Sequence, residues 1–388
     1  MLIHWIWFAQ LKGLSLHKKH QLLEHFRDPE EIFCAEEDAL LAAGLTREQV
    51  QTLDEKDLTE AQTITARCNS RAIGVLTLDD PAYPQRLRRI PAAPLVLYFK
   101  GVLPKWSDVP VIGIVGTRSS SAYGERTAKR FGSEIAACGA LVVSGGATGI
   151  DTAAMEGAVA VGKPTVCVLG CGVDITYPKN NGQFFRRVQE DGCLISEYPP
   201  QTKVAPWQFL ERNRIISGMS HALLVVEAPE KSGALNTARH ALEQGRDVFA
   251  VPGNVDSPSC RGSNGLLEEG AYPALSGWGV VRQYAPEYPA AVAQKPMIPE
   301  NLEPAAAKAD KKSIDKLENS TYSVVNKPTP ALSDSEQVVL ARLDKTPMAL
   351  DTLIDSLDLP AMNVKSILTK LTVKGLVVNH PGGRVSRK

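Results

Sequence analysis

Arginine side chains beside short polar loops indicate that this chain binds an anion. Arg212 and Arg214 flank Asn213 in the run FLERNRIISGMSHALLVVEA, shortly before an apolar segment. A guanidinium can donate two hydrogen bonds at once to phosphate oxygens. The chain carries 43 basic and 43 acidic residues, so an anion site must come from local clustering and not from net charge. The other basic candidates for this cluster are Arg118, Lys203 and Lys231.

Small and aromatic residues accompany these basic side chains. Glycine and serine let backbone N–H groups approach a ligand, and each such loop leads into a predicted helix N-terminus. Trp207 and Phe209 lie just before Arg212 and could stack on bases. In the structural alternative, Arg212 pairs with Glu211 or Glu197 at the surface. Trp207 then packs in the core. The loop residues predicted to bind the ligand are Ser119, Gly145, Gly146, Ser232, Gly233, Gly253 and Asn254.

Six short apolar runs predict the strands that position these loops. Each is rich in Val, Ile and Leu, lacks polar alternation and ends in Gly, Pro, Ser or an acid. Helix-like segments separate them at 124–138, 151–161, 180–190, 210–218 and 234–244. This pattern indicates an α/β fold whose parallel sheet is covered on both faces and binds ligands beyond the carboxyl ends of its strands. The runs are VPVIGIVG, ALVVSGG, KPTVCVLG, DGCLISEYPP, HALLVVEAP and RDVFAVPG.

Residues 1–70 are predicted to form a small helical module. SLHKKHQLLEHF and EEIFCAEEDALLAAG carry apolar residues at helical spacing, and Gly44 is suited to end a helix. The module has more acidic than basic residues, which argues against it as the main surface for a polyanion. A proline-rich link, LDDPAYPQRLRRIPAAPLVLYFKG, follows at the start of the core, which we assign to residues 71–283.

The C-terminal part is predicted to contain a linker and a second domain. Residues 284–331 are rich in Pro, Ala and Lys, which is typical of a flexible linker. Residues 332–388 show three helical segments, the first opened by the capping sequence SDSE, and a hairpin with its turn at PGG. This order resembles a winged helix, which binds either duplex DNA or a protein partner. The segment from Lys365 onward has six basic residues and no acid. Its candidate contact residues are Lys365, Lys370, Lys374 and Arg384.

Several other chemistries fit the sequence poorly. After the first core strand, GIVGTR departs from GxGxxG because Arg118 would occupy the close approach. GAVAVGKP departs from a P-loop because Pro164 replaces the magnesium-binding hydroxyl, and Gly162 is expected to end a helix there. A GxSxG nucleophile elbow is absent, which argues against Ser-His catalysis. The seven cysteines lack metal-ligand spacing, so we expect reduced thiols and no bound metal. We also expect no cofactor. The apolar N-terminal stretch is too short to span a bilayer, which predicts a cytoplasmic protein with no membrane attachment.

Eight motifs resemble, in order and spacing, those of the DprA/Smf family of DNA-processing proteins. The resemblance covers about residues 75–275 continuously, and the flanks look like the family's SAM or helix-hairpin-helix module and its winged helix. It implies an extended Rossmann-like parallel sheet in a cytosolic homodimer that binds single-stranded DNA during natural transformation. It also implies protection of incoming strands and loading of RecA, without enzymatic activity. The motifs are IVGTRSSSAYG, SGGATGID, VLGCGVDITYP, LISEYPP, RNRIISGMS, VVEAPEKSGALNTA, GRDVFAVPG and GSNGLLEEGA.

The resemblance assigns DNA contacts to residues already singled out. Arg118 matches the arginine of the family's G[ST]R motif, and residues 212–214 match its RNR motif. Lys203 falls where family members often carry a basic contact, and the predicted loop residues after the fifth and sixth runs match later motifs. Three positions depart from the pattern. Met155 replaces a histidine and Leu210 replaces a proline. Thr148 replaces a customary basic residue, which predicts the loss of one phosphate contact.

One alternative function stays open for the core. Related α/β folds with glycine-rich edges bind nucleotides and cleave phosphoribosyl bonds, so a nucleotide-binding hydrolase using Glu197 or Glu227 is a second hypothesis. A carboxylate at the end of a strand more often holds a loop arginine or a backbone N–H group. Release of free base from nucleoside monophosphates would distinguish the hydrolase from a DNA-binding protein.

Overall fold

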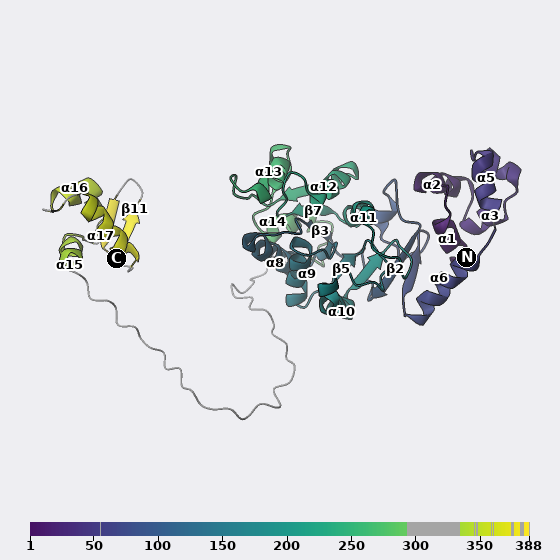
Figure 1. Ribbon diagram of the computed structural model, residues 1–388, viewed down its shortest axis with the longest axis horizontal. Helices are drawn as coiled ribbons and strands as arrows, with labels where there is room; N and C mark the ends of the chain where they lie inside the picture. The colour runs from purple at the N-terminus through teal and green to yellow at the C-terminus, as the bar shows by residue number, and fades with distance from the viewer. Residues whose placement is uncertain are drawn as a thin grey trace, which may run out of the picture. The chain divides into compact units, whose positions relative to one another are not determined.

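The computed structural model describes residues 1–292 except 55, and residues 334–387 except 345, 347, 358, 360, 374, 375 and 381–383. The described residues fall into two compact units, one up to residue 292 and one from residue 334. The first contains the helical module and the sheet, and the second contains the C-terminal helices and hairpin (Figure 1).

One mixed sheet of nine strands runs through residues 1–292 (Figure 1). The strands are β1 (Gly74–Thr77), β2 (Val96–Gly101), β3 (Val111–Val115), β4 (Leu141–Ser144), β5 (Thr165–Val168), β6 (Cys193–Ser196), β7 (Ala222–Val225), β8 (Asp247–Ala250) and β9 (Tyr272–Pro273). Their order is β1-β2-β6-β5-β4-β3-β7-β8-β9, and all neighbours from β6 to β9 are parallel. The predicted parallel sheet is therefore confirmed, with a strand in each of the six apolar runs.

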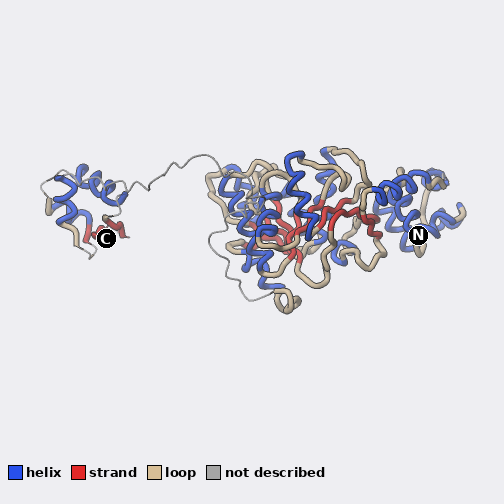
Figure 2. The backbone as a smooth tube through the Cα atoms, turned by 90° about the horizontal axis from the view of Figure 1, so that it is seen from below, coloured by secondary structure: helices blue, strands red, loops and turns tan. Residues whose placement is uncertain are grey.

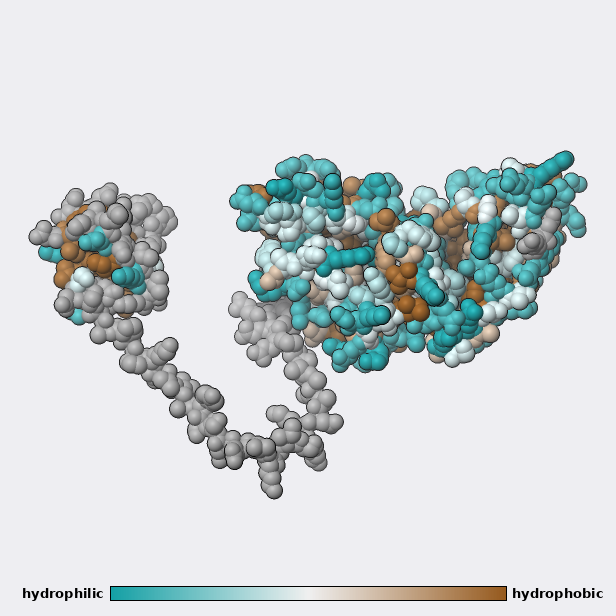
Figure 3. Space-filling model, in the orientation of Figure 1, coloured by the Kyte–Doolittle hydropathy of each residue, from teal (hydrophilic) through white to brown (hydrophobic). Residues whose placement is uncertain are grey.

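Helices cover both faces of the sheet (Figure 2). They are α7 (Gln85–Arg88), α8 (Ala122–Ala137), α9 (Ile150–Ala160), α10 (Gly182–Asp191), α11 (Pro206–Met219), α12 (Gly233–Glu243), α13 (Arg261–Glu268) and α14 (Gly277–Val281). Along β3, Val111 and Val115 pack with α7, α11 and α12, whereas Ile112 and Ile114 pack with α8, α9 and α14. This double burial explains why the strands lack polar alternation. The surface in Figure 3 is correspondingly largely hydrophilic.

The strand order creates a crevice at the carboxyl edge of the sheet. From β3 the chain steps outward through β4 and β5 to β6, and α11 then returns it to β7 on the other side of β3. The loops after β3 and β7 therefore leave adjacent strands in opposite directions. Ligands of open α/β sheets bind at such a switch point.

The N-terminal module is helical, as predicted, and its described residues form six helices. They are α1 (Leu2–Gln10), α2 (Leu16–His25), α3 (Pro29–Cys34), α4 (Glu37–Ala42), α5 (Arg47–Asp54) and α6 (Thr59–Ser70). The single helix expected at 30–44 is broken into α3 and α4, because Ala35 and Glu36 are extended. Gly44 has φ +85°, as suits the residue after a helix end. The apolar core of the module includes Val96 and Tyr98 of β2, so it continues into the sheet.

The proline-rich link belongs to the sheet, so its prediction as a connecting segment was wrong. β1 pairs antiparallel with β2, and β2 pairs antiparallel with β6. The buried Tyr83 donates a hydrogen bond from its hydroxyl to the carbonyl of Pro94 at 2.7 Å. The prolines lie between β1 and β2 and around α7, where they remove no hydrogen bond from the ladder.

The linker was predicted to begin at residue 284, which is too early. Tyr284, Tyr288 and Val292 pack against the apolar cluster that contains α8 and α14. Nε2 of His221 lies 2.7 Å from the hydroxyl of Tyr288, which adds a polar contact to this packing. The remaining part of the predicted linker, 293–331, lies outside the described residues.

The second unit has the predicted winged-helix arrangement. It comprises α15 (Asp334–Ala341), β10 (Met348–Ala349), α16 (Leu350–Asp355), α17 (Ala361–Val373), β11 (Val377–His380) and β12 (Arg384–Arg387). The strands pair antiparallel in the order β10-β12-β11, over a core that includes Leu353, Leu371 and Val385. Of the basic candidates, Lys365 and Lys370 lie on α17, Arg384 begins β12, and Lys374 lies outside the described residues.

The cysteines provide a test of the fold. Cys34 is exposed and the other six are buried and unpaired. Burial also raises the pKa of Cys138 to about 11 and the pKa of Cys193 to about 12, so their reactive thiolate forms are scarce at pH 8. We expect an aromatic disulfide reagent to modify one thiol per chain rapidly and all seven after unfolding in urea. Rapid modification of two or more thiols in the folded chain would contradict this fold.

Among the described residues, every helix is too short or too polar to cross a lipid bilayer. The same part of the chain holds no group of three His, Cys, Asp or Glu side chains placed to bind one metal ion.

Candidate functional site

A cavity of about 360 Å³ lies at the switch point, and we call it the arginine cavity. The β3–α8, β4–α9 and β7–α12 loops line it together with α11. Phe209 and Leu210 contribute apolar surface. The cavity therefore lies where the strand pattern predicted a ligand site. Its polar and charged lining residues are Thr117, Arg118, Asp151, Arg212, Asn213, Lys231, Ser232 and Thr237.

Arg118 presents an unpaired guanidinium to the arginine cavity. Its side chain is exposed and forms no ion pair with any described residue. The guanidinium carbon lies 5.0 Å from the centre of the Phe209 ring, which orients it by a cation–π contact. The hydroxyl of Thr148 donates to the carbonyl of Arg118 at 3.5 Å, so Thr148 supports the loop that carries this arginine. Arg118 is therefore free to bind a phosphate.

Arg212 is buried and forms the floor of the arginine cavity. Only 3% of its surface is exposed. Its Nη1 donates to the carbonyl of Gly145 at 2.7 Å and to the carbonyl of Val168, joining the ends of β4 and β5. Burial lowers the pKa of Arg212, and the nearby carboxylate of Asp151 opposes that shift. Arg212 thus adds positive charge to the cavity while its hydrogen bonds serve the fold.

The packing of Arg212 explains why residue 145 is a glycine, and it predicts the effect of replacing that glycine. A Cβ at Gly145 would collide with the guanidinium, whose bonds to two carbonyls prevent it from moving aside. We expect Gly145→Ala to lower the free energy of unfolding by about 2 kcal/mol. Gly233→Ala is the matched control, because a Cβ there meets nothing within 4 Å. Urea denaturation measures both, and equal stability of the two variants would contradict the proposed packing.

Arg214 faces away from the arginine cavity, so the predicted convergence of three guanidinium groups was wrong. Its Nη2 lies 2.5 Å from Oε2 of Glu197, and its Nη1 donates to the carbonyl of Ala92 at 2.6 Å. The reason is helical geometry: residues two apart lie about 200° apart around a helix. Because Arg212 faces the arginine cavity, Arg214 cannot. The predicted surface pairing of Arg212 with a glutamate is also wrong, since Arg214 is the partner of Glu197.

Asn213 fixes the loop opposite Arg118. Its Nδ2 donates to the carbonyl of Gly233 at 3.3 Å, which ties α11 to the start of α12. The hydroxyl of Ser232 accepts from the N–H of Ala234 and caps α12. Lys231 is exposed in the same loop. Asn213, Lys231, Ser232 and Gly233 therefore share the cavity with Arg118, Phe209 and Arg212.

The other predicted residues do not line this cavity. Gly145 and Gly146 are buried after β4, and Ser119 is exposed beyond Arg118. Lys203 follows β6, three strands from β3, which is about 14 Å along the sheet. Gly253 and Asn254 follow β8, which lies beyond β7. The N–H of Gly253 donates a hydrogen bond to Oδ1 of Asn264 at 3.0 Å. Lys203, Gly253 and Asn254 were predicted from loops at the correct edge, but their strands lie away from the switch point.

The two glutamates considered for hydrolysis have structural partners. Glu197 pairs with Arg214, as described above. The buried Glu227 accepts hydrogen bonds from the N–H of Ser121 at 3.0 Å and from the hydroxyl of Ser259. It thereby joins the loops after β3 and β8. Neither glutamate lines the arginine cavity.

Asp151 is a charged lining residue that the sequence interpretation missed, as it also missed Thr117 and Thr237. Asp151 is the second residue of α9 and is buried beneath the cavity. Burial raises the pKa of its carboxyl, while the charge of Arg212 lowers it. The motif SGGATGID could have identified this residue, because Asp151 is its final residue and lies just after the glycine-rich loop. Its charge balances that of Arg212, so the net positive charge that faces solvent comes from Arg118 and Lys231.

The fold and the site define an α/β protein with a basic cavity at the switch point of its sheet and a winged helix in the same chain. Comparison with known families gives its particular membership. The family model described as DNA recombination-mediator protein A matches residues 74–285, and the DprA winged helix domain matches residues 326–383. The chain belongs to the DprA/Smf family of DNA-processing proteins. The family predicted from the motifs is therefore confirmed.

Individual relatives agree with this assignment. Protein Smf of Synechocystis sp. is 32% identical over 99% of this chain and 98% of its own length. DNA processing protein DprA of Bacillus subtilis is 39% identical over 54% of this chain and 70% of its own length. The structure of DprA from Streptococcus pneumoniae has a TM-score of 0.63 at 30% identity, covering 73% of this chain and 98% of that one. DNA processing protein A of Helicobacter pylori, solved for its single-stranded DNA binding mode, has a TM-score of 0.50 at 28% identity over 56% of this chain and 97% of its own.

Proposed function

We propose that this chain binds single-stranded DNA without strong sequence preference through the arginine cavity. The observation that best supports this is the free guanidinium of Arg118 over Phe209. Lys231 adds positive charge, and Asp151, the one carboxylate among the described lining residues, is buried and balances the charge of Arg212. The single-stranded DNA binding of the Helicobacter pylori relative supports the same ligand.

Backbone contacts of this kind explain the proposed lack of sequence preference. Phosphates are the same at every nucleotide, and a basic groove with an aromatic surface tolerates any base. Each phosphate that is neutralised releases counterions, so affinity should fall steeply as salt rises.

Family membership supports a wider role. We infer that the protein protects incoming strands during natural transformation and promotes the loading of RecA, acting in the cytoplasm as a homodimer and without catalysis. The winged helix would contact duplex DNA or a protein partner. Lys370, exposed on α17, is its described basic candidate.

Binding of labelled oligo-dT and of duplex DNA at matched salt tests the proposal. The single strand should bind at least about tenfold more tightly, because its flexible backbone can enter the cavity. Equal or tighter binding of duplex would contradict it. Duplex binding that is lost in Lys370→Glu would instead locate a duplex contact on the winged helix. A shorter lag in RecA-dependent ATP hydrolysis on the oligonucleotide would support loading, and an unchanged lag would exclude it.

The hydrolase hypothesis now depends on Asp151, since Glu197 and Glu227 are engaged elsewhere. A buried carboxyl with a raised pKa beside an anion cavity is a reasonable general acid. Its place beneath Arg212 equally suits charge balance. Release of free base from a panel of nucleoside monophosphates, lost in Asp151→Asn, would favour the hydrolase.

A further inference from the structure

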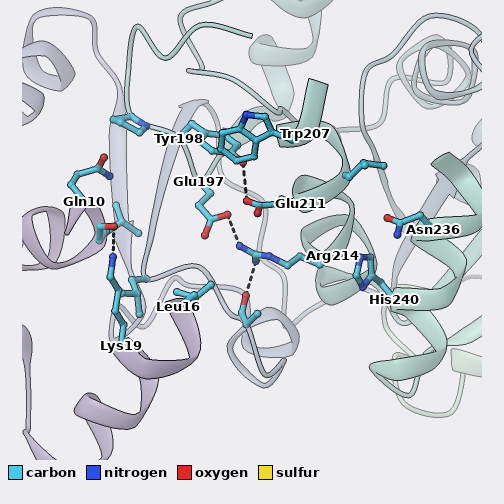
Figure 4. A pocket seen from close by; sticks show the side chains of 16 residues that line it. Gln10, Leu16, Lys19, Glu197, Tyr198, Trp207, Glu211, Arg214, Asn236 and His240 are labelled. Carbon is cyan, nitrogen blue, oxygen red and sulfur yellow. Dashed lines mark hydrogen bonds and ion pairs between the residues drawn. The ribbon is translucent and has the colours of Figure 1, made fainter. Parts of the chain in front are cut away.

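A second cavity, of about 650 Å³, lies on the opposite face of α11, and we call it the tryptophan cavity. Figure 4 shows Gln10 and Lys19 of the N-terminal helices on one side, and Asn236 and His240 of α12 on the other. Leu210 lines both cavities, so the two adjoin across the first turns of α11. A strand bound in one cavity can therefore reach the other.

Aromatic side chains form one wall of the tryptophan cavity. Trp207 and Tyr198 meet edge to face, with ring centres 6.1 Å apart and an interplanar angle of 81°. Trp207 is 56% exposed, so the structural alternative that placed it in the core was wrong. An exposed indole beside a phosphate-binding cavity offers a surface on which a base can stack.

Three side chains with available hydrogen-bond acceptors, Glu197, Glu211 and Asn236, also line the tryptophan cavity. The hydroxyl of Tyr198 contacts Oε2 of Glu211 at 3.4 Å, and Oε2 of Glu197 pairs with Arg214. The Oε1 atom of each glutamate forms no hydrogen bond with a described residue. Oδ1 of Asn236 is buried and likewise has no partner among the described residues. A buried acceptor without a donor is costly, and a ligand that donates hydrogen bonds would relieve that cost.

The cations of this cavity are already engaged. Arg214 binds Glu197 and the carbonyl of Ala92. Nζ of the buried Lys19 donates to the carbonyls of Ala9 and Leu11, both at 2.8 Å. Glu197 is neutralised by Arg214, whereas Glu211 forms no ion pair with a described residue, so the cavity has no unengaged positive charge among those residues to attract a phosphate. Its chemistry suits an uncharged, planar group that donates hydrogen bonds.

We propose that the tryptophan cavity accepts a nucleobase of the strand whose phosphates lie in the arginine cavity, and that it favours bases with an exocyclic amino group over thymine. This rests on the proposed function. The amino group of cytosine donates to carboxylates, as it does to Glu and Asp in groove recognition. Thymine has a single N–H donor and two carbonyl acceptors. The oxygen atoms of Glu197, Glu211 and Asn236 would repel those carbonyl oxygens.

The test compares three single strands of about 12 nucleotides and equal charge: oligo-dC, oligo-dT and an abasic strand. With the full chain at neutral pH, fluorescence anisotropy should show oligo-dC bound about fivefold more tightly than oligo-dT, and the abasic strand bound most weakly. Trp207→Ala should weaken oligo-dC binding about tenfold and leave the abasic strand unchanged. Glu211→Gln should reduce or reverse the preference for oligo-dC, because the new amide N–H can donate to thymine.

Controls separate this inference from the proposed function. Leu242→Ala removes a side chain of similar exposure, 57%, that lines neither cavity, and it should leave all three affinities unchanged. Arg118→Glu should weaken the binding of all three strands. Equal affinity of wild type for the three strands, with the Arg118→Glu effect intact, would overturn the base cavity and leave the phosphate site standing. Failure of the wild type to bind any strand would overturn both.

Discussion

Arg118→Glu is expected to weaken the binding of oligo-dT by about thirtyfold at about 0.1 M salt. The substitution removes a charge-assisted contact worth ~2 kcal/mol and places a carboxylate where the account puts a phosphate. Arg118 is exposed and forms no ion pair with a described residue, so the fold should be unaffected. Anisotropy titrations at several salt concentrations measure the effect. The milder Arg118→Gln should reduce the slope of log affinity against log salt by about one.

Arg130→Glu is the matched control for this charge reversal. Arg130 lies on α8, outside the residues that line the arginine cavity, with its side chain 54% exposed. The Arg130→Glu substitution changes the net charge by the same amount as Arg118→Glu. It should therefore alter the affinity for DNA only through the overall electrostatic field of the protein. A loss below threefold for Arg118→Glu, or an equal loss for Arg130→Glu, would show that the binding site lies elsewhere.

Arg212→Met is expected to destabilise the fold by about 3–5 kcal/mol. The substitution leaves the carbonyls of Gly145 and Val168 without their donor, and it leaves the buried charge of Asp151 unbalanced. The loss of DNA binding in this variant would then follow from a disordered cavity floor. Urea denaturation measures the change, with Arg118→Met as the exposed control, expected within ~0.5 kcal/mol of wild type.

A second substitution distinguishes the charge effect from the loss of packing. Asp151→Asn in the Arg212→Met background should recover part of the lost stability, because it removes the unbalanced carboxylate. In the wild-type background, the same substitution should destabilise the chain. If Arg212→Met is as stable as Arg118→Met, the assignment of Arg212 to the floor of the cavity is wrong.

The sheet could be predicted because its strands are buried on both faces. Such strands read as unbroken apolar runs, and the glycines after β3 and β4 mark where the loops begin. β1 and β2 were missed because they are antiparallel strands at one side of the sheet, and their pairing depends on β6, far away in the sequence. The prolines between them suggested a link, although they lie outside the ladder.

The site was predictable to the extent that it depends on strand ends. Arg118 and Lys231 follow the adjacent strands β3 and β7, and the strand order alone brings them together. Gly253 and Lys203 follow strands on either side of that pair, and the order of strands could not be read from the apolar runs. Arg214 was misplaced for a different reason, since its position two residues from Arg212 already implied the opposite face of α11.

Photocross-linking of the bound strand tests the central claim most directly. An oligo-dT strand containing 4-thiothymidine, bound to the full chain and irradiated, reports which peptides lie against the DNA. We expect cross-linked peptides from residues 116–121, 206–214 and 229–237, the three segments around the arginine cavity. Cross-links confined to the N-terminal helices or to residues 334–387 would contradict single-strand binding at the switch point of the sheet.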